Sequence, residues 1–225
     1  MWPQAVIFDF DGLILDTESV EVESWEIIFG RHGQVYPEWY WTYTLGRGAD
    51  QIEQAPADLL REAGVVFDED SLIAERTSLL FEMLQKLKPL PGVIDRIEEA
   101  SSLGLPLAVA SSSKHDWVDA HLERLGLLDK FNSIVCADDV PRAKPFPDLY
   151  LRACETLGTS PSEAIAFEDS GNGIAAAKQA GIYTVVVPNR ISLHVDLSAA
   201  DLRVDSLAHL TIAGLSRPGI SRRSS

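Results

Sequence analysis

Short apolar runs alternate with longer amphipathic segments over most of the chain. The apolar runs are VIFDF at 6–10, LPLAVA at 105–110, SIVCA at 133–137, AIAFE at 164–168 and YTVVV at 183–187. From Pro106 onward they are separated by segments with helical periodicity, such as HDWVDAHLERLGL. Strands separated by helices are joined by crossover connections, which makes them parallel neighbours in one sheet. The pattern therefore predicts an α/β fold, a doubly wound parallel Rossmann-like sheet of five strands with helices on both faces.

Residues 17–88 depart from this alternation. They contain helical periods and no convincing strand before the PLPGV turn at 89–93. We therefore expect an all-helical cap domain at 17–88, inserted into a core domain formed by 1–16 and 89–215. Ligands of such sheets bind at the carboxyl ends of the strands, so the cap is expected to act as a lid there. The Ser- and Arg-rich tail at 216–225 predicts disorder.

Two aspartates end the first predicted strand. Asp9 and Asp11 are separated by Phe10, and side chains alternate along a strand, so both carboxylates face the same side. Paired carboxylates repel each other unless a cation or a shared proton lies between them. The stretch therefore indicates a metal ion, a lysine or a shared proton at this point.

Polar side chains also follow three other predicted strands. They are Ser111, Ser112, Ser113 and Lys114 after the second strand, Lys144 after the third, and Glu168 and Asp169 at the end of the fourth. In a parallel sheet these positions converge on one crevice. Asp9 and Asp169 are suited to share Mg²⁺, which prefers oxygen ligands, while Lys144 and Ser111 are suited to hold a phosphate.

This set of side chains predicts phosphoryl chemistry. One carboxylate attacks the phosphoryl group and forms an acyl phosphate, which splits one difficult displacement into two easier ones. The other carboxylate protonates the leaving oxygen and then accepts a proton from the attacking water.

The net charge of the chain limits the kinds of molecule that it is expected to bind. A formal net charge of −15 argues against broad nucleic-acid binding, but an anionic small molecule remains compatible if a few cations line one cleft. The apolar runs are far too short to cross a bilayer, and two cysteines in 225 residues fit a reducing compartment, so we expect a cytoplasmic protein without a membrane partner. Oligomeric state is not readable from the chain.

Four motifs in order resemble those of the haloacid dehalogenase superfamily phosphohydrolases, in the branch that is similar to β-phosphoglucomutase. They are DFDGLILD at 9–16, the serine of VASSSK at Ser111, the lysine of KPFPD at Lys144, and EDSGNG at 168–173. The resemblance covers nearly the whole chain, and the set of four is highly specific.

The resemblance implies a role for each matched residue. It makes Asp9 the nucleophile, Asp11 the general acid/base, and Ser111 and Lys144 the phosphate ligands. It implies that Mg²⁺ is bound by Asp9 and Asp169, by the backbone carbonyl of Asp11, and by Glu168 through water. Gly12, Ser112 and Lys114 are further candidates for phosphate binding, although Ser112 and Ser113 fit turn positions better.

The sequence departs from the mutase pattern in the predicted cap. A mutase is expected to carry a histidine twelve residues past the nucleophile and an arginine three past Gly46, where this chain has Glu21 and Ala49. Glu21 and Arg47 are candidate substrate contacts. We therefore expect hydrolysis of a small phosphomonoester, such as a sugar phosphate, rather than phosphoglucomutase activity.

Three other classes of protein share part of this sequence pattern. The sequence SGNGIAAA resembles a dinucleotide-binding turn, but two acids precede its glycines where a pyrophosphate would lie. A phospho-accepting receiver domain lacks an inserted cap. A catalytically silent relative would differ only in failing to turn over a phosphomonoester.

Overall fold

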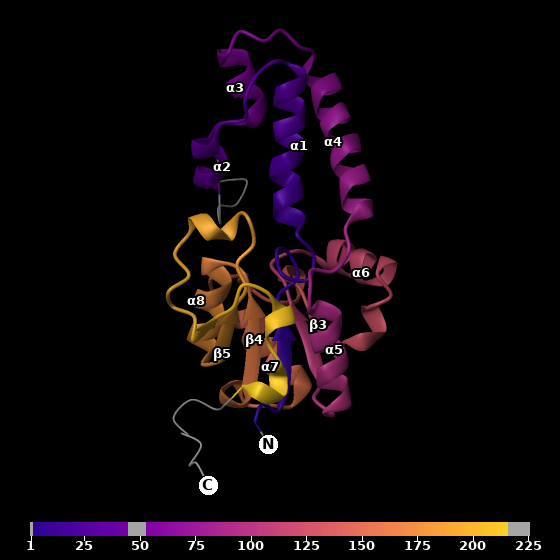
Figure 1. Ribbon diagram of the computed structural model, residues 1–225, viewed down its shortest axis with the longest axis vertical. Coiled ribbons are helices and arrows are strands. Elements are labelled where there is room, and N and C mark those ends of the chain that lie inside the picture. The colour runs from indigo at the N-terminus through magenta and orange to yellow at the C-terminus, as the bar shows by residue number, and fades with distance from the viewer. Residues whose placement is uncertain (1, 45–52, 216–225) are drawn as a thin grey trace. The chain divides into compact units, whose positions relative to one another are not determined.

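The computed structural model describes residues 2–44 and 53–215 (Figure 1). The chain forms two compact units, one made of residues 1–15 and 89–225 and the other of residues 16–88. Arg47 and the tail at 216–225, for which the sequence predicted a substrate contact and disorder, lie outside the described residues. No helix among the described residues is long and apolar enough to cross a membrane.

The larger unit contains a parallel sheet in the order β3-β2-β1-β4-β5-β6. Its strands are β1 (Ala5–Phe8), β2 (Leu107–Ala110), β3 (Ser133–Val135), β4 (Ala164–Glu168), β5 (Tyr183–Val186) and β6 (Leu202–Arg203). The α/β prediction is confirmed, but the predicted count of five strands was one short. The additional strand, β6, is only two residues long and lies at the edge beside β5.

Both faces of the sheet are covered, which explains why its central strands are apolar throughout rather than alternating. On one face, Ala5 and Ile7 of β1 pack in one core with Leu149 and Tyr150 of α7 and Ala176 of α8. The alternate residues of β1 are equally buried. The helices of this unit are α5 (Val93–Ser102), α6 (His115–Arg124), α7 (Asp148–Leu157) and α8 (Gly171–Ala180).

Helices are the only regular secondary structure among the described residues of the smaller unit. It contains α1 (Thr17–Arg31), α2 (Glu38–Thr44), α3 (Pro56–Glu62) and α4 (Glu69–Lys86). The side chain of Asp16 caps α1 by accepting a hydrogen bond from the Ser19 amide at 3.2 Å. Tyr36 and Tyr40 are buried in its aromatic core, where the ring of Tyr36 lies 4.9 Å from that of Phe29.

Candidate active site

The first two acids are carried by the turn that follows β1. The Asp9 amide donates to the Phe167 carbonyl at 2.9 Å and so extends the ladder between β1 and β4, and Asp9 as a residue is only 5% exposed. Gly12 then turns the chain with a φ of +86°. A Cβ at Gly12 would lie 2.2 Å from Oδ2 of Asp169, so this turn requires glycine for both its backbone angle and the close carboxylate.

Lys144 connects two acids from different strands. Its ammonium group pairs with Asp9 and, at 2.6 Å, with Oε1 of Glu168. Burial raises the pKa of Asp9 to about 8, although the Lys144 charge opposes that shift. Burial alone would lower the pKa of Lys144, but the charges of Asp9 and Glu168 outweigh it and raise the pKa above its usual value. The lysine is therefore held as a buried cation beside the proposed nucleophile.

Tyr150 completes the environment of Glu168. Its hydroxyl donates to Oε1 of Glu168 at 2.6 Å, and the Lys144 ammonium lies 5.3 Å from the centre of its ring. Tyr150 and Glu168 are both fully buried, and burial holds the pKa of Tyr150 well above its usual range. The tyrosine therefore acts as a fixed donor to this carboxylate.

The end of β4 holds the remaining acids against the backbone. The Glu168 Oε2 atom accepts from the amides of Asp169 and Ser170 at 3.1 and 3.3 Å. Asn189, in the loop after β5, donates to Oδ2 of Asp169 at 2.7 Å and to the Gly12 carbonyl at 3.1 Å. One asparagine thus ties the turn after β1 to the acid after β4.

These acids fit a hard divalent cation. Asp9, Glu168 and Asp169 are all buried, and each offers a carboxylate oxygen within 4.8 Å of those of the other two. One lysine does not balance three buried carboxylates, and burying an uncompensated charge is costly. A cation with a preference for carboxylate oxygen, such as Mg²⁺, would supply the missing positive charge.

Asp11 faces a different group of donors. Ser113 Oγ donates to its Oδ2 at 2.6 Å, Ser111 Oγ lies 3.4 Å from the same oxygen, and Trp117 Nε1 donates to its Oδ1 at 2.9 Å. The structure therefore brings Ser111 to Asp11, as convergence of the strand ends predicted.

Three other candidates lie away from these carboxylate contacts. Ser112 and Lys114 are exposed on the loop between β2 and α6. Glu21 lies on α1 of the smaller unit, where its carboxylate pairs with Arg76 of α4.

Sequence reasoning missed Ser113 as a side-chain contact and also missed Trp117, Tyr150 and Asn189. Ser113 was assigned to a turn, although its neighbour Ser111 was recognised. Asn189 follows the fifth predicted strand, YTVVV at 183–187. Its position at a strand end was the signal that could have identified it.

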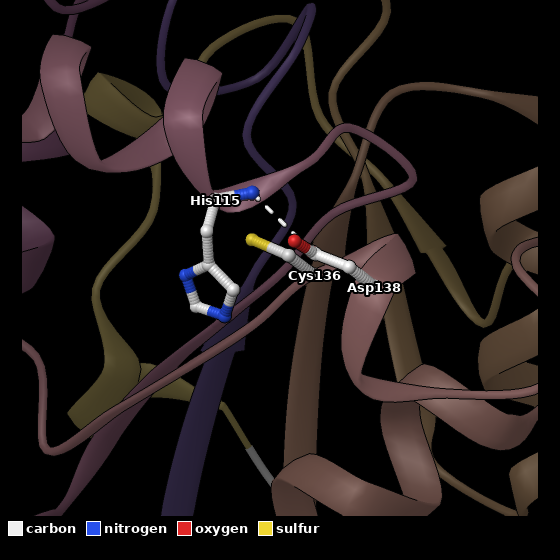
Figure 2. A group of neighbouring side chains, drawn as sticks. All are labelled: His115, Cys136 and Asp138. Carbon is white, nitrogen blue, oxygen red and sulfur yellow. Dashed lines mark hydrogen bonds between the residues drawn. The ribbon is translucent and has the colours of Figure 1, made fainter.

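A second group of possible metal ligands consists of His115, Cys136 and Asp138 (Figure 2). Figure 2 shows these side chains converging from the start of α6 and from the loop after β3. Both ring nitrogens of His115 already contact carboxylates, Nδ1 that of Asp119 at 3.0 Å and Nε2 that of Asp139 at 2.8 Å. The contacts of His115 with these two carboxylates therefore explain the position of its ring without a bound ion.

Comparison with known proteins places this geometry in a family. The model of the haloacid dehalogenase-like hydrolases matches residues 6–187. A Bacillus subtilis (strain 168) protein named "Putative phosphatase YhcW" is 42% identical over 211 residues, which cover 93% of this chain and 94% of the relative. The fructose-1-phosphate phosphatase YqaB of Escherichia coli (strain K12) is 34% identical over 183 residues, or 81% of this chain and 95% of the relative.

A solved structure supports the same assignment. It is described as a "putative beta-phosphoglucomutase from Thermotoga maritima" and superposes with a TM-score of 0.74 at 29% identity. The match covers 92% of this chain and 95% of that protein. The similarity therefore includes most of both units.

Proposed function

Because this chain belongs to the haloacid dehalogenase-like hydrolases, we propose that it is a Mg²⁺-dependent phosphatase that hydrolyses a small phosphomonoester through an aspartyl-phosphate intermediate. The observation that carries the proposal is the pairing of buried Asp9 with Lys144, beside Glu168 and Asp169. A buried carboxylate beside a buried cation is suited to attack an anionic phosphoryl group.

Asp9 and Asp11 divide the reaction between them. An Asp9 oxygen bonds to phosphorus while the ester P–O bond breaks, and Asp11 gives its proton to the departing oxygen. Water then attacks the phosphorus of the acyl phosphate. Asp11 takes a proton from that water as the bond between phosphorus and Asp9 breaks, which regenerates both carboxyl groups and releases inorganic phosphate.

Lys144 is the cation of this chain that is suited to hold the phosphate beside Asp9. Lys144 is positioned for a phosphate oxygen, with Glu168 and Tyr150 restricting where its ammonium group can move. Ser111 is the proposed hydroxyl donor to the same group. The metal would be held by Asp9, Asp169 and the Asp11 carbonyl, with Glu168 nearby, and when bound it would neutralise charge on the phosphoryl oxygens.

We propose a sugar phosphate or a similar metabolite as the substrate. The similarity to a fructose-1-phosphate phosphatase over 81% of this chain supports that class. We assign residues 17–88 the role of a cap that selects the leaving group and excludes water, with Glu21 and Arg47 as candidate contacts.

Phosphoglucomutase activity is the second candidate, because of the similarity to the Thermotoga maritima structure. The side chain at position 21 argues against it. Glu21 is paired with Arg76 and stands where the mutase pattern has a histidine.

Phosphate release from a panel of phosphomonoesters, with Mg²⁺ or with EDTA, tests the proposal. The panel includes fructose 1-phosphate, and β-glucose 1-phosphate with a trace of the bisphosphate. We expect Mg²⁺-dependent release of phosphate from one chemical class. Glucose 6-phosphate formed without phosphate release would identify a mutase, and no turnover of any compound would contradict both assignments.

A further inference from the structure

The carboxylate of Asp11 lies between donors that come from one short segment of the chain. The Trp117 indole N–H donates to Oδ1 at 2.9 Å, and the Ser113 hydroxyl donates to Oδ2 at 2.6 Å. Each oxygen of the carboxylate therefore has its own donor. Two donors on opposite oxygens define the plane of the group, whereas the terminal torsion of an aspartate is otherwise broad.

Both donors are attached to regular structure. The Ser113 carbonyl accepts from the Ala137 amide at 2.9 Å, and its amide donates to Ser111 Oγ at 3.0 Å. Trp117 lies in the first turn of α6, and its ring meets the buried ring of His121 edge to face at 4.5 Å. The orientation imposed on Asp11 is therefore set by the scaffold.

The two donors differ in whether they are compatible with a proton on the Asp11 oxygen that they contact. An indole N–H can only donate, so Oδ1 stays an acceptor whether Asp11 is charged or protonated. A hydroxyl can donate or accept, so Ser113 tolerates a proton on Oδ2. The tryptophan thus makes the two oxygens of one carboxyl group chemically distinct.

We propose that Trp117 and Ser113 are positioning residues that orient Asp11 and assign its transferable proton to Oδ2, the oxygen beside Ser111. This inference rests on the proposed function, in which Asp11 is the acid and base. The proton on Oδ2 passes to the leaving oxygen as the ester P–O bond breaks. Oδ2 then receives a proton from water as the oxygen of that water bonds to phosphorus and the Asp9 oxygen departs.

Trp117→Phe tests the proposal because it removes the N–H and keeps an aromatic ring against His121. The kinetic constants are measured in Mg²⁺ with fructose 1-phosphate, whose leaving alkoxide needs a proton, and with p-nitrophenyl phosphate, whose leaving group needs little protonation. General acid–base catalysis contributes about 10²- to 10⁴-fold, so a misoriented acid is expected to lower kcat for the alkyl ester about tenfold. We expect a loss of no more than about twofold for the nitrophenyl ester and an unchanged KM for both.

Ser113 provides an independent pair of variants. Ser113→Ala removes the shorter of the two hydroxyl contacts to Oδ2 and leaves that of Ser111 at 3.4 Å. It is expected to repeat the selective loss of kcat, whereas Ser113→Thr keeps a hydroxyl and is expected to restore kcat. A double variant with Asp11→Asn gives a further test. Trp117→Phe should have no additional effect on the alkyl ester once the acid is absent.

Trp2→Phe is the matched control. Trp2 also donates its indole N–H, to the Ser162 carbonyl at 3.3 Å, and also packs against another ring, that of Tyr183. Its substitution should leave both substrates unaffected. Equal losses of kcat for the two esters in Trp117→Phe, or unchanged or higher kcat for the alkyl ester, would overturn the inference.

Failure of the positioning role and failure of the proposed function give different experimental results. If only the positioning role is wrong, the wild type still releases phosphate and still depends on Asp9 and Asp11, while Trp117→Phe lacks the selective loss. If the proposed function is wrong, the wild type releases no phosphate, or Asp11→Asn leaves turnover of the alkyl ester unchanged. Either of these last results also removes the basis for the inference.

Discussion

The hydroxyl of Tyr150 donates a 2.6 Å hydrogen bond to Oε1 of Glu168, and both side chains are fully buried. The bond joins α7 to the last residue of β4. Because Lys144 contacts the same Glu168 oxygen at 2.6 Å, this tyrosine helps to fix the carboxylate that in turn holds the lysine.

Tyr150→Phe is expected to lower the free energy of unfolding by about 1.5–3 kcal/mol, the usual range for a hydrogen bond to a charged group. The phenyl ring keeps the packing and the contact with Lys144, so the change reports mainly the lost hydroxyl. Urea unfolding measures the difference. Tyr183→Phe, on partly exposed β5, is the matched control and should cost less than about 0.5 kcal/mol. Equal effects of the two substitutions would contradict the role given to Tyr150.

Gly173→Ala is expected to disturb Glu168 directly. A Cβ at this position would lie 1.9 Å from Oε1 of Glu168, so the carboxylate has to move. We expect a loss of about 1–3 kcal/mol in stability, together with a lower kcat. Gly30→Ala provides the comparison, because a Cβ there meets nothing within 4 Å on α1 and should stabilise the helix by roughly 0.5–1 kcal/mol. A Gly173→Ala protein with wild-type stability and kcat would show that Glu168 has more room than the structure gives it.

His115 predicts a pH dependence of stability away from the proposed metal ligands. Burial opposes a charge on its ring, but the hydrogen bonds and charges of Asp139 and Asp119 outweigh burial and raise the pKa above 6.5. A raised folded-state pKa stabilises the fold below the unfolded value, and this contribution disappears as pH rises through the folded value. Of the other facing groups, Cys136 stays a neutral thiol because burial raises its pKa to about 12.

The comparison of wild type with His115→Gln, unfolded in urea with EDTA present, measures this effect. The difference in unfolding free energy should be largest between about pH 5 and pH 6 and should shrink as pH rises above the usual histidine value of about 6.5. A difference that stays constant from pH 5 to pH 8 would mean that the His115 ring carries no pH-dependent charge in this network.

Asp11→Asn is expected to separate two kinds of substrate. Loss of the acid should lower kcat by about 10²-fold or more for an alkyl phosphate and much less for p-nitrophenyl phosphate. Steady-state kinetics in Mg²⁺ provide the comparison. Equal losses for the two substrates would exclude Asp11 as the proton donor to the leaving oxygen.

The sheet was predictable because each of its five longer strands is a compact apolar run bounded by polar residues. The strand β6 was not, since two residues, Leu202 and Arg203, form no periodic pattern. The resemblance to haloacid dehalogenase-like hydrolases is confirmed by the family match over residues 6–187.

The acids were predictable because the carboxyl ends of parallel strands meet at one edge, which brings Asp9 to Glu168 and Asp169. The residues that donate hydrogen bonds to this part of the site, such as Trp117 and Asn189, were not predictable from the sequence. Trp117 reaches Asp11 across 106 residues, from a helix whose rotation determines where the indole points. Asn189 reaches the Gly12 carbonyl across 177 residues through a loop with no repeating pattern. Such contacts depend on tertiary packing that local periodicity does not encode.

Phosphate release by Asp9→Asn in Mg²⁺ tests whether Asp9 is the nucleophile. Asp95→Asn is the matched control, because Asp95 is exposed in the first turn of α5. Asparagine preserves the shape of the buried side chain and removes a charge that burial disfavours, so thermal unfolding should show an intact fold. If Asp9 is the nucleophile, kcat should fall roughly 10³-fold or more for Asp9→Asn, and Asp95→Asn should keep wild-type turnover. Turnover by folded Asp9→Asn within about tenfold of the wild type would contradict nucleophilic attack by Asp9.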